Sequence, residues 1–150
     1  MEVTVKPLMI VMCGLPASGK STYANGLDPD KFVVVSTDAI RKELNGSESD
    51  QANPQAVFDT AYERIDTALA LGKCVCFDAT NLKARNRKWL CKKYGDRAQM
   101  MCVYAPTSAE ECIRRDSMRE RVVGAEVINR MAGSMSTPSA DEGFYLIMTI

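Results

Sequence analysis

The chain has 150 residues, the length of one ordinary domain, and its 19 Lys and Arg residues balance its 19 Asp and Glu residues, so the formal net charge is zero. It contains no histidine, which excludes a Ser-His-Asp triad, a histidine general base and any metal site that needs imidazole. Zero net charge argues against a protein that coats nucleic acid through charge alone, and it is compatible with a local basic cleft. We therefore expect a single domain over residues 1–150.

Apolar runs alternate along the chain with stretches of helical periodicity. Buried strands are expected at Leu8–Cys13, Phe32–Val35, Cys74–Phe77 and Gln99–Tyr104, and a short edge strand at Phe144–Ile150. Helices are expected at Lys20–Leu27, Asp38–Leu44, Pro54–Leu71, Ala84–Tyr94, Ala109–Arg119 and Glu126–Met131. This alternation predicts an α/β three-layer sandwich, with a mostly parallel sheet of four to five strands and helices on both faces. Ligands of such a sheet bind at the carboxyl ends of its strands.

A phosphate-binding pattern follows the first expected strand. The run Gly14-Leu15-Pro16-Ala17-Ser18-Gly19-Lys20-Ser21 fits G-x-x-x-x-G-K-[ST] at each fixed position, and the strand before it and the helix after it argue against a chance match. Lys20 is expected to reach the β- and γ-phosphates, the Ser21 hydroxyl to ligate Mg²⁺, and Thr22 to bind the α-phosphate. The residues expected to bind ATP or another nucleoside triphosphate here are Gly14, Pro16, Ala17, Ser18, Gly19, Lys20, Ser21 and Thr22.

The second motif, Ser36-Thr37-Asp38-Ala39-Ile40-Arg41, follows the second expected strand. The chain has neither the Asp-Glu strand end of large ATPases nor the N-K-x-D motif of GTPases, which leaves a small phosphotransferase. Asp38 can accept the proton of an attacking hydroxyl, and Arg41, three residues on, can hold an anionic part of the acceptor. In the alternative interpretation Asp38 only caps a helix and Arg41 is a surface residue.

The third motif, Asp78-Ala79-Thr80-Asn81, ends the third expected strand. We expect Asp78 near the γ-phosphate, where it accepts hydrogen bonds from Mg²⁺-bound water or from an arginine, and we count Asp78 and Asn81 as substrate-binding residues. The alternative is a strand-end turn in which Asn81 caps the next helix.

The fourth motif is a cluster of arginines within an expected lid over residues 112–125. Arg115 and Arg119 are expected to bind the triphosphate and to neutralise charge on the transferred group, Arg119 as a catalytic residue beside Lys20 and Asp38. Arg114 and Arg121 are further candidates for this role. The alternative is a solvated helix face whose arginines pair with Glu110, Glu111, Asp116 and Glu120.

The ends of the chain and its cysteines bear on the compartment. The longest apolar stretch, Leu8–Leu15, is too short to span a bilayer, and the first residues lack a secretory pattern. Six cysteines have neither CxxC spacing nor histidine partners, so we interpret them as core residues in a reducing compartment. We expect a cytoplasmic protein with no membrane partner.

Together the four motifs resemble the 5′-hydroxyl polynucleotide kinases of phage and bacteria. The resemblance runs from about Leu8 to Met131 and rests on GLPASGKST, STDAIRKEL, FDATNL and RRDSMRERV with EVINRM. It implies a kinase-type P-loop NTPase fold and an enzyme that uses ATP and Mg²⁺ to phosphorylate the 5′-hydroxyl end of DNA or RNA. It also implies a place in nucleic-acid repair, in the cytoplasm of a bacterial cell or a phage-infected host.

The resemblance assigns roles residue by residue. It implies that Asp38 is the general base and that Arg41 contacts the acceptor phosphate next to the 5′ nucleoside. It implies that Lys20 and Ser21 are the phosphate- and metal-binding pair. It also implies that Asp78 belongs to the acidic motif and that Arg119 is the lid arginine. The usual Val-Pro after the lid arginines is Val123-Gly124 here, and no ligase or phosphatase domain is apparent, so end healing would need a separate partner enzyme.

Two alternatives remain at this point: a P-loop kinase of a small-molecule hydroxyl, such as that of a nucleoside, sugar or antibiotic, and a regulatory nucleotide-binding module. The charge distribution bears on the choice. Residues 1–80 hold 7 basic and 11 acidic residues, a net of −4, whereas residues 81–150 hold 12 and 8, a net of +4. The basic run from Asn81 to Arg97 contains Trp89 and Tyr94, which predicts either a strand-binding surface with stacking aromatics or an amphipathic helix with Trp89 and Leu90 in the core.

Overall fold

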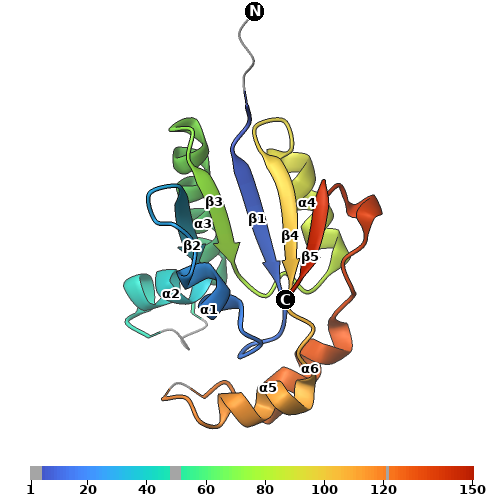
Figure 1. The fold of residues 1–150 in the computed structure, drawn as a ribbon. Helices are drawn as coiled ribbons and strands as arrows, with labels where there is room; N and C mark the ends of the chain where they lie inside the picture. Colours follow the sequence, from blue (N-terminus) through green and yellow to red (C-terminus); the bar gives the residue numbers. More distant parts are fainter. Residues whose placement is uncertain (1–4, 48–51, 121) are drawn as a thin grey trace, which may run out of the picture.

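The computed structural model describes residues 5–47, 52–120 and 122–150 (Figure 1). Its five strands form one parallel sheet in the order β2-β3-β1-β4-β5. The strands are β1 (Leu8–Cys13), β2 (Phe32–Ser36), β3 (Cys74–Asp78), β4 (Gln99–Tyr104) and β5 (Leu146–Thr149). The α/β fold predicted from the alternation of strands and helices is confirmed, and every strand pair of the sheet is parallel.

Helices cover both faces of the sheet. They are α1 (Lys20–Asn25), α2 (Thr37–Asn45), α3 (Pro54–Ala70), α4 (Ala84–Tyr94), α5 (Ala109–Asp116) and α6 (Ala125–Ser134), with a short 3₁₀ helix η1 (Ala140–Glu142) before β5. In Figure 1, α1 lies in front of the sheet, α3 and α4 lie behind it, and α5 and α6 lie beyond the carboxyl ends of the strands. No helix in the described part of the chain is long and apolar enough to cross a membrane.

The core is built on both sides of the central strand β1. Met9 and Val11 pack on the side of α3 and α4, in a cluster that includes Phe77, and Ile10 and Met12 pack on the side of α1. All four β1 side chains are almost fully buried. A strand buried on both faces is apolar at every position, which is why β1 lacks the alternation of a half-exposed strand.

Strand β2 corrects one prediction, because only Val35 of this strand is fully buried. It lies at the edge of the sheet, and Val33 and Val34 are 36% and 40% exposed. A short apolar segment can form either a central strand or an edge strand, so its composition does not predict its place in the sheet. Cys74 at the start of β3 is likewise only partly buried, and all six cysteines are free.

Helix α4 divides the residues of the basic run between core and surface. Arg87 and Tyr94 are completely buried, which contradicts their place on a strand-binding surface, and Trp89 is 45% exposed, which contradicts its place in the core. Arg87 forms a buried ion pair with Glu142 of η1, 2.6 Å from Nε to Oε1, and also donates to the carbonyl oxygens of Asn81 and Leu82 at 2.9 and 2.8 Å. This ion pair ties α4 to η1 and fixes the loop that follows β3.

Candidate active site

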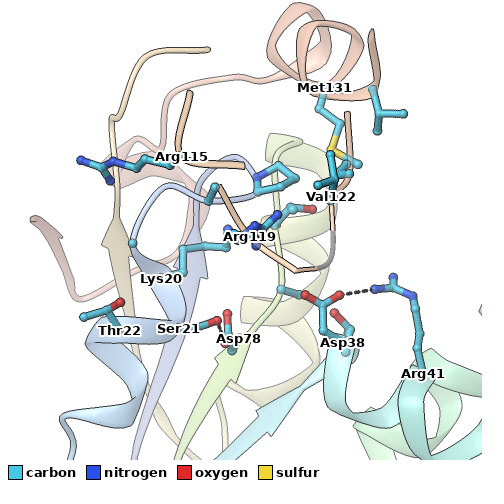
Figure 2. Close-up of a pocket in the computed structure, with 18 of the residues that line it drawn as sticks. Lys20, Ser21, Thr22, Asp38, Arg41, Asp78, Arg115, Arg119, Val122 and Met131 are labelled. Atoms are coloured by element: carbon cyan, nitrogen blue, oxygen red, sulfur yellow. Dashed lines mark hydrogen bonds and ion pairs between the residues drawn. The ribbon is translucent and has the colours of Figure 1, made fainter. Parts of the chain in front are cut away.

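A cavity of about 610 Å³ opens at the carboxyl ends of β1, β2 and β3. Its lining comes from the loop after β1, α1, α2, α3, the end of β3 and the region of α5 and α6 (Figure 2). The sheet register brings Ser36 at the end of β2 beside Asp78 at the end of β3. The polar residues predicted at three separate strand ends therefore meet in one place.

The loop between β1 and α1 has the backbone that its glycines predict. A Cβ on Gly14 would lie 2.6 Å from Ser18 Oγ and 3.0 Å from the Ala105 carbonyl oxygen, so no side chain fits there. Gly19 has a φ of 106° and Ala17 a φ of 64°, both in the left-handed region. The loop is fastened at both ends, because Gly14 N donates to the Thr80 carbonyl oxygen and Thr107 Oγ1 donates to that of Ser18. Such a loop presents successive N–H groups to an anion.

Lys20, the first residue of α1, is buried and points along this loop. Its Nζ donates to the Leu15 carbonyl oxygen at 2.7 Å and lies 3.5 Å from Ser18 Oγ. Burial lowers the pKa of this ammonium, and the nearby carboxylates of Asp78 and Asp38 oppose the shift. The ammonium thus lies within the loop, at the position from which it can bind a phosphate oxygen.

Ser21 and Asp78 form the floor of the cavity. Ser21 Oγ donates to Asp78 Oδ2 at 2.9 Å, and burial raises the pKa of the Asp78 carboxyl although the Ser21 hydroxyl and Lys20 lower it. A hydroxyl and a carboxylate are hard oxygen ligands that fit Mg²⁺, which takes few protein ligands and fills its octahedron with phosphates and water. No group of three or more acidic, Cys or His side chains that could hold a metal occurs among the described residues, so the protein alone offers only this partial set.

Asp38 and Arg41 form the rim on the side of α2. Arg41 Nη1 lies 2.8 Å from Asp38 Oδ1, and the Arg41 side chain is 16% exposed against 42% for Asp38 (Figure 2). The helix is capped by Ser36, whose Oγ accepts from Ala39 N, so Asp38 is not the N-cap of the alternative interpretation. Asp38 therefore lies in the first turn of α2 and faces the loop that holds Lys20 across the cavity.

Arginines from the region of α5 and α6 line the opposite side. Arg119 is held by the buried Asp116 and has an Nε that is buried without a hydrogen-bond partner among the described residues. Arg115 also lines the cavity, with its Nε 3.0 Å from Glu111 Oε1. Arg114 pairs with the same carboxylate and does not line the cavity, and Arg121 lies outside the described residues.

Arg119 is held by Asp116, one of the acids that the alternative interpretation paired with these arginines, but Asp116 is buried and not part of a solvated helix face. Asp116 ends α5 and is 1% exposed, and its carboxylate accepts from Arg119 Nη2, from Val123 N at 3.0 Å and from Gly124 N at 2.8 Å. These bonds close the turn after α5 and hold the Arg119 guanidinium at the cavity. Burial would raise the pKa of Asp116, but the hydrogen bonds from Arg119 and the two backbone N–H groups lower it overall.

Not every predicted site residue lines the cavity. Gly14 and Ser18 are buried and are not among its lining residues, and the Asn81 Nδ2 donates to the Met12 carbonyl oxygen at 2.7 Å. Asn81 also has a φ of 45°, so it shapes the turn after β3 and ties it to β1. The Asn81 side chain is thus engaged with β1 and, unlike Asp78, does not line the cavity. Of the other predicted residues, the cavity is lined by Pro16, Ala17, Gly19, Lys20, Ser21, Thr22, Asp38, Arg41, Asp78, Arg115 and Arg119.

The cavity also has an apolar wall that the motifs did not predict. It is formed by Phe58 of α3, Val122, and Val127 and Met131 of α6. Val127 and Met131 are four residues apart, so they share one face of α6, and this spacing was the available indication. In Figure 2, Val122 and Met131 lie above the pair of Asp38 and Arg41.

The sequence and the fold can be compared with known proteins at this point. A family model described as AAA domain matches residues 9–138, which is most of the chain. The chain belongs to this AAA domain family. A curated relative, Transcription factor bHLH140 of Arabidopsis thaliana, is 27% identical over 150 residues, covering 95% of this chain and 16% of that protein. This AAA domain therefore spans a small part of its relative's length.

Solved structures share the fold. One chain of the Pnkp1/Rnl/Hen1 RNA repair complex superposes with a TM-score of 0.77 at 20% identity, over 89% of this chain and 45% of that one. A sugar kinase from Janibacter sp. HTCC2649 superposes with a TM-score of 0.68 at 18% identity, over 95% of this chain and 85% of that one. The likeness shows that this AAA domain has the fold of a P-loop kinase-like domain.

Proposed function

We propose that this protein is an ATP-dependent kinase that transfers a phosphoryl group to the 5′-hydroxyl of a polynucleotide. The observation that carries the proposal is the arrangement of Asp38 and Arg41 across one cavity from the phosphate-binding loop. A phosphotransferase needs a positioned base and charge neutralisation, and a polynucleotide adds a phosphate close to the hydroxyl that reacts. The likeness to a chain of an RNA repair complex supports the same acceptor.

On the acceptor side, Asp38 accepts the proton of the attacking hydroxyl and Arg41 binds the acceptor phosphate. The 2.8 Å ion pair between them means that Arg41 neutralises the base while the acceptor site is empty. A phosphate that draws the guanidinium toward itself lets the Asp38 oxygen turn to the hydroxyl and accept its proton. An acceptor without a phosphate beside its hydroxyl lacks this effect.

On the donor side, Lys20 and Arg119 offset the negative charge of the transferred group. The buried Nε of Arg119, which has no hydrogen-bond partner among the residues that the structure describes, is a donor that an anion in the cavity would satisfy. Ser21 and Asp78 would hold Mg²⁺, which supplies charge neutralisation at the phosphates. The lid that we propose over residues 112–125 is held by Asp116, which fixes Arg119 in place.

A kinase of a small-molecule hydroxyl is the second candidate, and the likeness to a sugar kinase favours it. The apolar wall argues against a sugar, because a polyhydroxylated acceptor would leave its hydroxyls without partners against Phe58, Val122, Val127 and Met131. A nucleoside presents a flat base that such a wall can cover. We also propose that the protein acts in the cytoplasm, beside a separate ligase or phosphatase that completes end repair.

Arg41 distinguishes the two candidates. We expect kcat/KM for a nucleoside 3′-monophosphate acceptor to exceed that for the plain nucleoside. The expected ratio is about tenfold or more, the contribution of a charge-assisted hydrogen bond. We expect Arg41→Ala to remove most of this difference. Lys42→Ala, one residue further along α2 and exposed, is the matched control. Equal activity of the wild type on both acceptors, or a preference for sugars, would contradict the polynucleotide assignment.

A further inference from the structure

Trp89 is the only tryptophan of the chain, and it stands in the middle of the solvent face of α4. It is 45% exposed, whereas Arg87, Leu90, Cys91 and Tyr94 bury the opposite face of the helix. Nearly half of the surface of this large aromatic side chain is therefore accessible to a ligand from solvent.

Cations surround this tryptophan on the helix surface. Arg85, Lys92 and Lys93 lie at spacings of minus four, plus three and plus four from it, so they are its neighbours on the same face. All three are exposed, and none forms an ion pair with a carboxylate of the described residues. Lys93 Nζ lies 5.5 Å from the centroid of the Trp89 ring. Helix α4 itself contains no acidic residue.

A row of aromatic rings connects this face to the catalytic cavity. Trp89 contacts Tyr62 of α3 with a centroid distance of 5.0 Å, and Tyr62 lies 6.1 Å from Phe58 on the same helix. Phe58 lines the cavity that contains Asp38. The row therefore begins at the wall of the cavity that contains Asp38 and ends on the solvent face of α4.

We propose that the α4 face, defined as Arg85, Trp89, Lys92 and Lys93, binds the single-stranded part of a polynucleotide acceptor that follows its 5′ end. This inference rests on the proposed function and specifies the part of the acceptor that lies outside the cavity. Bases stack on exposed aromatic rings regardless of sequence, and flanking cations bind the phosphates between them. A surface of this kind needs no net positive charge on the whole protein, which agrees with a formal charge of zero.

The charges of α3 and α4 determine on which side the backbone and the bases of the bound strand lie. Helix α3 presents the exposed carboxylates of Asp59 and Glu63, and its Asp66 is paired with Arg97 at 3.0 Å. Phosphates are repelled from that side, so the backbone of the strand lies over the cations of α4 and its bases lie toward the aromatic row. The proposal therefore requires the α4 cations and Trp89 to act together.

Intrinsic fluorescence tests the interaction without any requirement for catalysis, because Trp89 is the sole tryptophan. We expect single-stranded 5′-hydroxyl oligothymidylates to quench it in a saturable way, with affinity that rises from dimer to octamer and then levels off. Replacement of Lys92 and Lys93 by alanine should weaken this binding and reduce the slope of log affinity against log salt by about 0.7 for each phosphate that is no longer neutralised. No quenching at any length would overturn the proposal and favour an acidic protein as the occupant.

Steady-state kinetics test whether strand binding at the α4 face contributes to phosphoryl transfer. Trp89→Ala should raise KM for an octamer acceptor about tenfold, the loss of one stacked base, with kcat and the KM for a dinucleotide unchanged. Trp89→Phe should restore the octamer KM, since phenylalanine also stacks. Tyr145→Ala, which removes another exposed aromatic far along the chain, is the control for general surface effects.

The outcomes separate this inference from the proposed function. If oligonucleotides are phosphorylated, while Trp89→Ala has the wild-type KM at every length, the α4 face is not part of the acceptor site and the kinase assignment stands. If no oligonucleotide is phosphorylated, but octamers quench Trp89 and dimers do not, the surface binds strands and the kinase assignment fails.

Discussion

Asp116→Asn tests whether one buried carboxylate positions the arginine proposed to act on the transferred group. Asp116 Oδ1 accepts from Arg119 and Val123, and Oδ2 accepts from Gly124 at 2.8 Å. The substitution turns one acceptor into an NH₂ donor, and in either orientation this donor faces an N–H group. A buried hydrogen bond left unmade costs about 1–3 kcal/mol. If that cost loosens Arg119, kcat should fall about ten- to a hundredfold.

The assay compares kcat and the KM for ATP, together with limited proteolysis of the turn after α5. We expect kcat to fall more than KM rises, and cleavage after α5 to become faster. Glu110→Gln removes an exposed carboxylate of the same helix without an ion pair among the described residues, and it should behave as wild type. A normal kcat in Asp116→Asn, with a reduced kcat in Arg119→Ala, would refute the positioning role.

Three further predictions concern the remaining site residues and the buried ion pair of α4. Asp38→Ala should abolish phosphoryl transfer and leave ATP binding nearly intact, whereas Lys20→Ala should lose both transfer and ATP binding. Isothermal titration calorimetry measures ATP binding beside the activity assay, and full activity of Asp38→Ala would contradict this prediction. Because burial raises the pKa of Asp78, protons should compete with Mg²⁺ at higher pH than at an ordinary carboxylate. Mg²⁺ affinity should therefore weaken with falling pH, and should begin to do so at a higher pH than at an ordinary carboxylate. A flat profile, or the same profile in Asp78→Asn, would contradict the metal site. Arg87→Ala leaves Glu142 buried without its partner and should lower the free energy of unfolding by about 3–5 kcal/mol in urea denaturation, and a loss below about 1 kcal/mol would contradict the structural role of this pair.

Local patterns predicted most of the fold. Strands Leu8–Cys13 and Gln99–Tyr104 and helix Ala84–Tyr94 have the predicted bounds, because apolar runs and helical spacing depend on neighbours in sequence. The order of strands depends on packing between distant segments, which explains why the edge position of β2 was missed. Helix α5 ends at Asp116, three residues before the predicted end, because the Asp116 carboxylate takes the N–H groups of Val123 and Gly124 and the chain turns there.

The site was predictable where one motif carries the chemistry and not where distant residues support it. The phosphate-binding loop, Asp38 and Asp78 follow strands whose carboxyl ends meet, so their meeting place could be inferred from the sequence. The role of Arg87 could not be inferred, because its partner Glu142 is 55 residues away and the sequence does not distinguish a buried arginine from an exposed one in a basic helix. The contact of Asn81 with β1 could not be predicted for the same reason, because its partner is a backbone carbonyl of a distant strand.

Phosphoryl transfer to a 5′-hydroxyl oligonucleotide tests the central claim most directly. The protein is incubated with Mg²⁺, ATP labelled in its γ-phosphate and 5′-hydroxyl DNA or RNA, beside mononucleosides and gluconate, and the labelled strand is digested to locate the label. The proposal predicts label in the 5′-terminal nucleotide of the strand, lost in Asp38→Ala. An unlabelled oligonucleotide with a labelled sugar or nucleoside would contradict it.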